Sequence, residues 1–404
     1  MAKWLYRTAK NLVVLIYRIM CLIFPVKENR IVFDSNLGKS YSGNPRHIYE
    51  ALVAHGLDMK WDCIWFYEND TYNIPGMSRQ VRYGRLRYLY YMATAKVWVF
   101  DSRQPEFLRR RKGTYYIQTW HGTPLKRLAL DMDDVFMAGE SDIDTYKNFF
   151  VKNVSTWDYL ISQNPFSSET FRRCFDFHKE MLEIGYPRND ILFRENTKED
   201  NIRLRRRLGL PLDKKIILYA PTFRDDEFSE EDKYEFQPKI SFDVLKRELG
   251  DEYVMIVKYH YLIMDAVDWS PYEGFIYHFD QSRDIAELFI VSDLLITDYS
   301  SVMFDYSILK RPMFFFAYDL DKYKNELRGF YFSYSGEMPG PISVTTEELI
   351  RDIKNYSPDE YSEKYEKFCK KYNSVDDGKA STKVMELLEQ LIPSKRPNIF
   401  YESE

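Results

Sequence analysis

The sequence predicts an α/β protein whose two domains are each built on a doubly wound parallel sheet. Two observations predict this fold class. The chain has 404 residues, which is more than one hydrophobic core usually holds together. From residue 30 onward, short apolar runs alternate with helical stretches, and this alternation is typical of parallel strands connected by helices. We expect a first domain at residues 27–190 and a second at residues 191–395.

The expected strands are short runs rich in β-branched and aromatic residues, a composition typical of parallel strands covered on both faces. In the first domain they are residues 31–34, 61–67, 96–100, 115–119, 159–162 and 181–184, and in the second 215–220, 253–259, 275–279, 294–297 and 313–317. A turn-rich segment, residues 185–190, is the expected hinge. Doubly wound sheets bind ligands outside the carboxyl ends of their strands, so two facing sheets would share a cleft.

The N-terminal residues 1–26 form a separate element, an amphipathic helix that ends at Pro25. Its apolar run, residues 12–24, is interrupted by Arg18 and is shorter than the about 20 residues that a membrane-spanning helix needs. One narrow arc of the helical wheel is basic, with Lys3, Arg7, Lys10 and Arg18, and most of the rest is apolar. This pattern predicts a helix in the interface of an anionic membrane. A helix packed on the protein's own surface is the alternative.

Composition argues against several classes of function. A net charge of −5 disfavours a general nucleic-acid-binding protein, because such proteins need a basic surface. The four cysteines show no paired spacing, which disfavours disulfides and structural zinc and favours a reducing cytoplasm. The dinucleotide fingerprint and the P-loop pattern do not occur. Three D-x-D triplets, which begin at Asp131, Asp142 and Asp319, are interpreted as solvated loops, so no metal is expected.

The most informative segment of the first domain is Trp120-His121-Gly122-Thr123-Pro124-Leu125-Lys126, directly after an expected strand. Imidazole titrates near neutral pH, so His121 suits a general base, with a structural histidine as the alternative. Thr123 is a favoured helix N-cap and Pro124 a favoured first helical residue, so we expect a helix to begin here. Free N–H groups at such a helix start attract anions such as phosphate.

Polar residues also follow three expected strands of the second domain. Thr222 and Arg224 follow the first of them, and the Arg224 guanidinium suits phosphate binding, with a salt bridge to a neighbouring aspartate as the alternative. Lys258 and His260 end the next strand, where they can contact a phosphate oxygen. Ordinary strand-end polarity explains His260 nearly as well.

The segment Thr297-Asp298-Tyr299-Ser300-Ser301 follows a third strand of this domain. Ser300 is expected to cap a helix, and the paired hydroxyls with the free N–H groups would hold phosphate. Asp305 lies one helical turn beyond Ser301, so it shares the face of Ser301 and can accept hydrogen bonds from ribose or polyol hydroxyls.

Five segments together resemble one known family. They are W-H-G-T-P-L-K at 120–126, Y-A-P-T-F-R-D at 219–225, T-D-Y-S-S-x-x-F-D at 297–305, L-K-R-P at 309–312, and R-G-F-Y-F with P-G-P-I at 328–342. In this order, over roughly residues 30–390, they resemble the CDP-glycerol:poly(glycerophosphate) glycerophosphotransferases of teichoic acid synthesis.

The resemblance implies a GT-B-like fold, in which two Rossmann-like domains face a cleft, with the acceptor on the first domain and the CDP-linked donor on the second. It implies His121 and His260 as catalytic residues. The donor and phosphate side would comprise Thr222, Arg224, Lys258, Ser300, Ser301 and Asp305, and the acceptor side Gly122, Thr123 and Lys126. Tyr261 follows His260 where the family often has proline, which weakens the assignment of His260 more than that of His121.

The implied activity transfers glycerol phosphate from CDP-glycerol to a hydroxyl of an undecaprenyl diphosphate-linked disaccharide and releases CMP. The resemblance places such a protein peripherally at the cytoplasmic face of the bacterial membrane, beside other teichoic acid enzymes as candidate partners, and requires no cofactor. The modest length resembles primase-type members. The alternatives are a CDP-ribitol-using enzyme, a polymerase or capsule transferase of the same family, a GT-B nucleotide-sugar glycosyltransferase, and a non-catalytic membrane scaffold.

Overall fold

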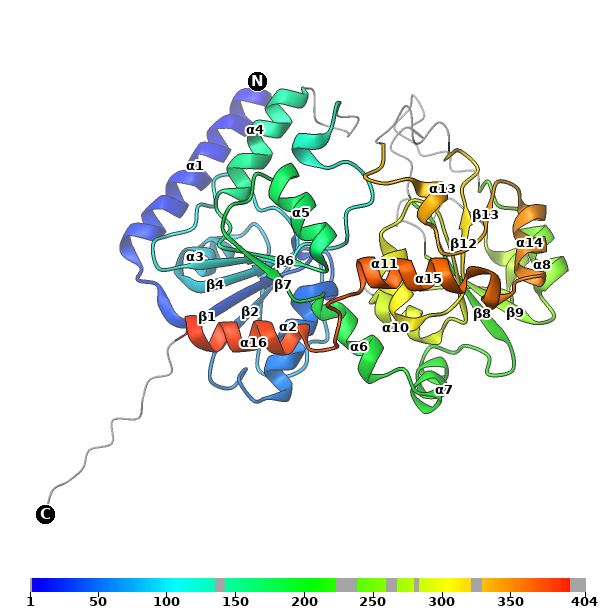
Figure 1. Cartoon of the computed structure of the whole chain (residues 1–404). Coiled ribbons are helices and arrows are strands. Elements are labelled where there is room, and N and C mark those ends of the chain that lie inside the picture. Colours follow the sequence, from blue (N-terminus) through cyan, green and yellow to red (C-terminus); the bar gives the residue numbers. More distant parts are fainter. Residues whose placement is uncertain are drawn as a thin grey trace, which may run out of the picture.

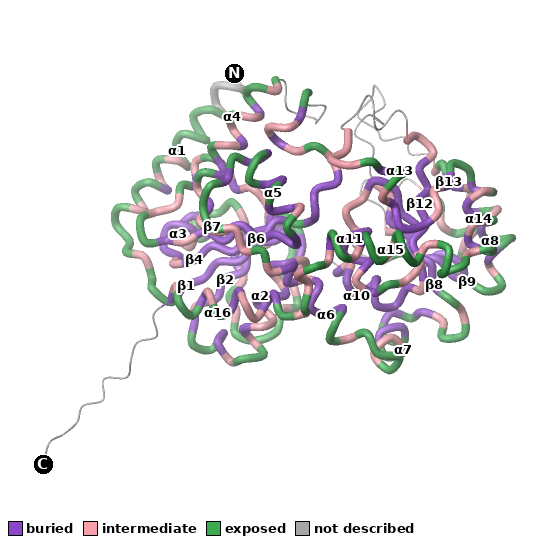
Figure 2. The backbone as a smooth tube through the Cα atoms, in the orientation of Figure 1, coloured by how far each residue is buried: buried purple, intermediate pink, exposed green. Residues whose placement is uncertain are grey.

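The computed structural model describes residues 2–134, 142–222, 238–258, 267–279, 283–320 and 329–392, with side chains from residue 7 onward. Within these residues the chain forms two α/β domains that lie side by side, each with its own parallel sheet (Figure 1). Buried residues gather along the strands of both sheets, whereas helix α1 (Ala2–Ile23) at the outer edge is largely exposed (Figure 2). The predicted α/β class with two sheets is therefore confirmed.

The sheet of the first domain has seven strands in the order β3-β2-β1-β4-β5-β6-β7, and all neighbours are parallel. The strands are β1 (Lys27–Asp34), β2 (Asp62–Tyr67), β3 (Arg79–Arg82), β4 (Ala95–Phe100), β5 (Tyr115–Gln118), β6 (Tyr159–Ser162) and β7 (Glu180–Glu183). Strand β3 was not predicted, because it is a short edge strand in which only Val81 is buried.

Successive strand residues point to opposite sides of the sheet, and here both sides are apolar. Helices therefore cover both faces of this sheet. Val32 packs in the core beneath α1, α3, α4 and α5, whereas Ile31 and Phe33 pack in the core beneath α2 and α16. These helices are α2 (Gly43–Ala54), α3 (Leu86–Thr94), α4 (Ile143–Val154), α5 (Pro165–Cys174) and α16 (Ala380–Leu391).

The sheet of the second domain has six strands in the order β10-β9-β8-β11-β12-β13, again all parallel. The strands are β8 (Lys215–Ala220), β9 (Tyr253–Val257), β10 (Ile276–His278), β11 (Leu294–Thr297), β12 (Met313–Phe316) and β13 (Ile342–Ser343). Strand β13 was not predicted, since two residues are too few to form a recognisable apolar run.

Helices α8 (Phe242–Leu249) and α14 (Thr346–Lys354) cover one face of the second sheet. The other face packs against α7 (Lys198–Arg207), α10 (Ile285–Val291), α11 (Val302–Tyr306) and α15 (Pro358–Tyr372). Short elements complete the described chain: α6 (Asp190–Arg194), α13 (Tyr334–Glu337), and the 3-10 turns at Asn36–Gly38, Ala129–Asp131, Pro187–Asn189, Ser270–Tyr272 and Ser307–Leu309.

The chain crosses back to the first domain at its C-terminal end. Helix α16 packs through Val384, Met385 and Leu388 into the core beneath α2. The carboxylate of Asp190 accepts hydrogen bonds from the amides of Ala380 at 3.0 Å and Ser381 at 2.7 Å, and so anchors the start of this helix. Residues 380–392 thus lie on the first domain, which differs from the expected second-domain boundary at residue 395.

Helix α1 lies along the outer face of the first domain, beside α4 (Figure 1). One side of α1 packs on the domain through Tyr17, which is 2% exposed, and through the partly buried Ile16 and Met20. The opposite side is apolar and exposed: Leu12, Leu15, Ile19, Leu22 and Ile23. Among the described residues, no helix combines the length and hydropathy that crossing a bilayer requires.

Candidate active site

A cavity of about 420 Å³ lies between the two domains, at the carboxyl ends of strands from both sheets. The first domain contributes the segment after β5, from Trp120 to Lys126 together with Leu128. The second domain contributes residues after β8, β9 and β11. Eight sequence-predicted residues thus line one cavity: His121, Gly122, Thr123, Lys126, Thr222, Lys258, Ser300 and Ser301.

The backbone turns sharply at Trp120, whose φ angle is +51°. This left-handed conformation costs a non-glycine residue on the order of 1–3 kcal/mol and is typical of functional sites. Two side chains hold the turn. The Gln118 amide oxygen accepts the Trp120 N–H at 3.0 Å, and the Asn44 amide donates to the carbonyls of Thr119 at 3.1 Å and Trp120 at 3.0 Å. The strained turn places the next residue, His121, in the cavity wall.

The imidazole of His121 is held in one tautomer. Its Nδ1 lies 3.0 Å from the carbonyl oxygen of Asp101, at the end of β4. A carbonyl oxygen only accepts hydrogen bonds, so Nδ1 carries the proton and Nε2 keeps a free lone pair in the neutral ring. The ring also stacks on Trp120 with centroids 4.5 Å apart. His121 is therefore oriented as a base.

The surroundings of His121 keep it neutral. Its ring is solvent-accessible from the cavity, but the protein around the cavity displaces much of the nearby water, and this desolvation lowers the pKa of His121 below its ordinary value. The negative charge of Asp101 raises the pKa of His121, whereas the positive charges of Arg188 and Arg103 lower it further. An imidazole with a lowered pKa is unprotonated at neutral pH, as a general base must be.

The motifs of the two domains touch directly at Gly122. A Cβ atom at this position would lie 2.6 Å from the hydroxyl oxygen of Ser301 and 3.1 Å from its Cβ. A side chain at residue 122 would therefore force the Ser301 hydroxyl to rotate or shift and the Ser301 Cβ to move by a few tenths of an ångström. Glycine here allows the wall that carries His121 to pack against the wall that carries the paired serines.

The helix predicted to start at Thr123 is absent, and this prediction was wrong. The Thr123 hydroxyl does not cap; it donates to the Gln163 side chain at 2.7 Å and accepts from Asn164 at 3.1 Å. The following residues are extended, because Lys126 pairs with Phe330 of the second domain in an antiparallel bridge. Tertiary hydrogen bonds thus replace the helical ones, and the first motif presents no helix N-terminus to the cavity.

On the second-domain side, a buried carboxylate organises two strand ends. The Asp298 side chain accepts the amides of Thr222 at 2.8 Å and Tyr299 at 2.6 Å, and so ties the segment after β8 to the turn after β11. The Ser300 hydroxyl lies 3.5 Å from the amide of Val302, where α11 begins. The N-cap position of α11 is nevertheless Ser301, whose side chain makes no capping hydrogen bond, so the prediction of Ser300 as the cap was wrong by one residue.

Lys258 supplies positive charge to the same wall. It follows β9 immediately, and its amide donates to the carbonyl of Tyr219 at 2.9 Å. Its Nζ lies 3.4 Å from the carbonyl oxygen of Arg283, and the side chain lines the cavity. An ammonium group beside two hydroxyls suits an anionic ligand such as phosphate.

Asp305 is not placed where the sequence predicted. It is absent from the cavity lining and almost completely buried. Its two carboxylate oxygens accept hydrogen bonds from the Arg188 guanidinium and from the Asn189 amide at 2.8 Å. The Arg188 guanidinium also donates to the His121 carbonyl at 2.9 Å. Asp305 therefore joins the hinge segment to the second domain. The predicted binding of polyol hydroxyls by Asp305 is corrected, because its carboxylate does not face the cavity.

Two predicted residues, Arg224 and His260, lie outside the described residues.

In two of the D-x-D triplets, the first aspartate interacts with other residues of the protein. Asp131 pairs with Arg173 at 2.8 Å, and Asp142 caps α4 by accepting the amide of Thr145 at 2.8 Å. The third triplet, which begins at Asp319, extends beyond the described residues.

Sequence reasoning missed the residues that hold His121 in place. Asn44, Asp101, Arg103 and Arg188 come from three separate segments of the first domain and its hinge, with Asp101 and Arg103 both directly after β4. Asp101 directly follows an apolar strand, and Arg188 lies in the predicted hinge, so both positions carried a usable signal. Asn44 and Arg103 carried none, because their importance depends on tertiary contacts.

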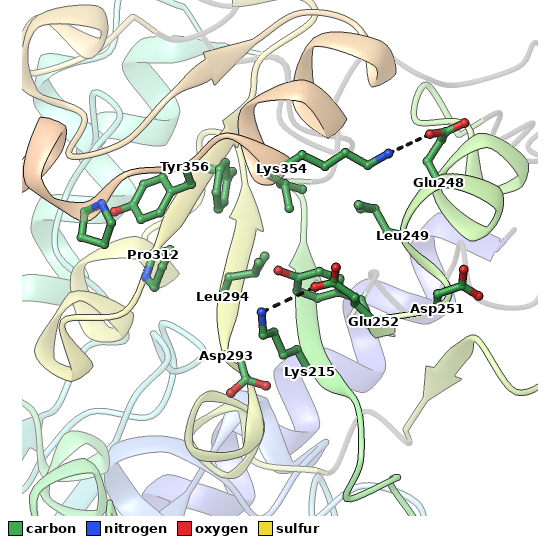
Figure 3. A pocket seen from close by; sticks show the side chains of 14 residues that line it. Lys215, Glu248, Leu249, Asp251, Glu252, Asp293, Leu294, Pro312, Lys354 and Tyr356 are labelled. Carbon is green, nitrogen blue, oxygen red and sulfur yellow. Dashed lines mark hydrogen bonds and ion pairs between the residues drawn. The ribbon is translucent and has the colours of Figure 1, made fainter.

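A second cavity, of about 640 Å³, lies at the amino ends of β8, β9 and β11, the opposite edge of the second sheet (Figure 3). Four of its charged side chains form ion pairs with one another. Lys215 lies 3.6 Å from Glu252, and Lys354 lies 2.8 Å from Glu248. Ligands of doubly wound sheets bind at the carboxyl edge, so we assign the candidate active site to the interdomain cavity.

Comparison with known proteins finds relatives that match nearly the whole chain. The family model described as CDP-Glycerol:Poly(glycerophosphate) glycerophosphotransferase matches residues 15–390. The teichoic acid poly(glycerol phosphate) polymerase of Bacillus subtilis (strain 168) is 44% identical over 392 residues, which are 95% of this chain and 51% of that protein. The chain thus spans about half the length of this relative.

A polymerase of the same name from Bacillus spizizenii (strain ATCC 23059 / NRRL B-14472 / W23) is 44% identical over 381 residues, which are 93% of this chain and 95% of that protein. Among solved structures, that of the wall teichoic acid polymerase TagF is 44% identical, with a TM-score of 0.89 and coverage of 96% of both chains.

Proposed function

Because the chain belongs to the CDP-glycerol:poly(glycerophosphate) glycerophosphotransferase family, we propose that it transfers glycerol phosphate from CDP-glycerol to an acceptor hydroxyl and releases CMP. One observation carries the proposal. A neutral imidazole from the first domain and an ammonium with paired hydroxyls from the second line the same cavity. The donor assignment is also supported by TagF, a variant of which has been soaked with CDPG.

In the proposed reaction, the acceptor hydroxyl attacks the β-phosphorus of CDP-glycerol in line. Nε2 of His121 takes the hydroxyl proton as the new P–O bond forms, and the bond to CMP breaks. Such transfers depend on positioning and charge stabilisation. Lys258, Ser300 and Ser301 would offset the charge that accumulates on the phosphate oxygens. Arg224 and His260 are proposed to assist on the same side.

The donor polyol is proposed to be glycerol. The two polymerases that share 44% identity are named for glycerol phosphate, which favours CDP-glycerol over CDP-ribitol. Calorimetric titration with CDP-glycerol, CDP-ribitol and a UDP-sugar tests this choice. Tighter binding of CDP-ribitol or of the UDP-sugar would overturn it.

The number of units added is proposed to be more than one. The modest length of the chain resembles that of primase-type members, but the Bacillus spizizenii relative is named a polymerase and is covered over 95% of its length. Length therefore does not argue against repeated transfer. The proposed acceptor is lipid-linked and ends in a hydroxyl, and the protein would work as a peripheral protein on the cytoplasmic face of the membrane.

Incubation of the purified protein with CDP-glycerol and a lipid-linked disaccharide acceptor tests the transfer. We expect CMP release and a ladder of products that differ by one glycerol phosphate in mass. A single added unit would reverse the proposal of repeated transfer. No CMP release from folded protein, with this acceptor or with one that already carries glycerol phosphate, would overturn the activity.

A further inference from the structure

A predominantly apolar groove separate from the active-site cavity runs between helix α1 and the loop at residues 105–111. Its volume is about 860 Å³, which lies within the range of sites that enclose a small molecule. Its apolar lining comes from three segments: Val14, Tyr17, Cys21 and Leu22 of α1, Pro105 and Phe107 of the loop, and Phe149 of α4.

The rim of this groove is basic. Four cations, Lys10, Arg18, Arg109 and Arg111, line it together with one carboxylate, Glu106. Glu106 already pairs with Lys152 at 2.7 Å, and Arg111 donates to the backbone carbonyls of Phe24 and Ala93. Within the described part of the chain, Lys10, Arg18 and Arg109 form no ion pair within 4 Å, although the charges of Lys10 and Arg109 help to lower the pKa of Glu106. In a chain with a net charge of −5, this is a local excess of positive charge.

The groove is continuous with the exposed apolar side of α1. Leu22 belongs to both: it lines the groove and is 85% exposed. Leu15 and Ile19, on the same exposed side, are 53% and 43% exposed. A hydrocarbon chain that contacts the exposed side can therefore enter the groove past Leu22, alongside the Arg18 side chain at the rim.

Contacts between α1 and the 105–111 loop hold the two walls of the groove in place. The Tyr17 hydroxyl donates to the carbonyl of Arg109 at 2.9 Å, and its ring meets Phe107 edge to face with centroids 6.3 Å apart. These contacts join α1 to the loop below the groove and hold it open. Its shape is thus a feature of the fold.

We propose that this groove binds one anionic membrane phospholipid, with a hydrocarbon chain between α1 and the 105–111 loop and the phosphate against Lys10, Arg18 and Arg109. The apolar lining matches the chain, the unpaired cations match the phosphate, and the exposed side of α1 gives the path of entry. The inference goes beyond the proposed transfer reaction and does not depend on it, since lipid binding needs no turnover.

Photocrosslinking on the full chain tests the proposal. The probe is phosphatidylglycerol with a diazirine in the middle of one acyl chain, mixed into phosphatidylcholine vesicles, and labelled peptides are identified by mass spectrometry. We expect labels on residues 105–111 and on Phe149 as well as on α1. Labels confined to the exposed side of α1 would show insertion of the helix alone and would overturn the proposal.

A matched pair of variants separates the groove from the helix surface. Val14→Trp should reduce labelling of the 105–111 loop roughly tenfold or more, because an added indole fills the apolar space, while vesicle binding persists. Leu15→Trp adds the same bulk on the exposed side and should leave loop labelling unchanged. Equal loop labelling in both variants would contradict the proposal.

A charge variant gives an independent test should Val14→Trp fold poorly. Arg18→Gln with Arg109→Gln should remove the preference of loop labelling for phosphatidylglycerol over a phosphatidylcholine probe, whereas Arg206→Gln, on α7 of the other domain, should keep it. Excess inorganic phosphate should compete only weakly. Full competition by inorganic phosphate would identify a free-anion site, and crosslinks between two protein copies at the groove would identify a self-interface; either result would overturn the lipid assignment.

Discussion

The two walls of the interdomain cavity are built in different ways. On the first-domain side, an extended segment is held by side chains from distant elements, among them Asn44 and Gln163, and tolerates a left-handed Trp120. On the second-domain side, the single carboxylate of Asp298 ties two strand ends together, and the chain enters α11 directly. The first wall fixes one imidazole in one tautomer, whereas the second gathers hydroxyls and an ammonium. We interpret the first as the wall that moves a proton and the second as the wall that stabilises phosphate charge.

The largest effect that separates the two walls is expected at His121. His121→Ala should lower turnover by about 100- to 10,000-fold, because a general base is lost. The rate of CMP release at saturating CDP-glycerol measures this effect. His178→Ala, an exposed histidine that pairs with Asp176, is the matched control and should keep full activity. Turnover within about threefold of wild type in His121→Ala would show that His121 is not the general base.

A second effect concerns the membrane, which we expect only the first domain to contact. Reversal of Lys3, Arg7, Lys10 and Arg18 to Glu should weaken binding to anionic vesicles on the order of a thousandfold, since each basic residue contributes about 1 kcal/mol. Deletion of residues 1–24 should have the same result, and activity on a soluble acceptor should survive.

The control for this experiment reverses four exposed basic residues of the second domain, Lys198, Arg206, Lys364 and Lys370. It should sediment with vesicles like the wild type. If instead the reversals on α1 leave vesicle binding unchanged, α1 is a structural helix and the membrane contact lies elsewhere.

The contact between the walls can be tested at Gly122. Gly122→Ala should lower turnover by about five- to 150-fold, the equivalent of the roughly 1–3 kcal/mol that overpacking costs, because its methyl group would meet Ser301. Ser301→Gly gives space to that methyl group, so Gly122→Ala should cost much less in this background. Equal costs in both backgrounds, measured as a double-mutant cycle, would show that the two walls do not touch during the reaction.

The smallest expected effect is a change in pH dependence. The base works only when unprotonated, so turnover should fall as the pH drops through the pKa of His121. Desolvation lowers this pKa, so the acid limb of the rate profile should have its midpoint below 6.5, the ordinary value. Arg103→Gln removes a positive charge that lowers the pKa further, and should move the limb to higher pH. A shift to lower pH would contradict the assignment of the limb to His121.

Most of the fold could be predicted because apolar runs mark buried strands directly. Strands β3 and β13 escaped, since an edge strand with one buried residue and a strand of two residues leave no such pattern. The cavity residues were predictable because strand ends of parallel sheets meet at one edge. The helix at Thr123 failed for a different reason: its partners Gln163 and Asn164 lie about 40 residues away, and only the tertiary structure brings them to the Thr123 hydroxyl.

Asp305 shows that the spacing of residues in the sequence does not identify the partner of a charged side chain. Its spacing from Ser301 placed it on the expected face of a helix, but burial selects a different partner. Arg188 lies 117 residues away in the sequence and forms the ion pair with Asp305. Local periodicity predicts which residues share a face of an element, whereas the partner of a charged group depends on how the domains meet.

Calorimetric titration of CDP-glycerol into the wild type, His121→Ala and Ser301→Ala tests most directly whether the two walls divide proton transfer and phosphate binding between them. We expect a nearly unchanged Kd for His121→Ala, because the imidazole acts on the acceptor, and a Kd raised by roughly tenfold or more for Ser301→Ala, because a hydrogen bond to a charged phosphate is lost. A Kd raised tenfold by His121→Ala, with Ser301→Ala unaffected, would reverse the assignment of proton transfer, phosphate binding and substrates to the two domains.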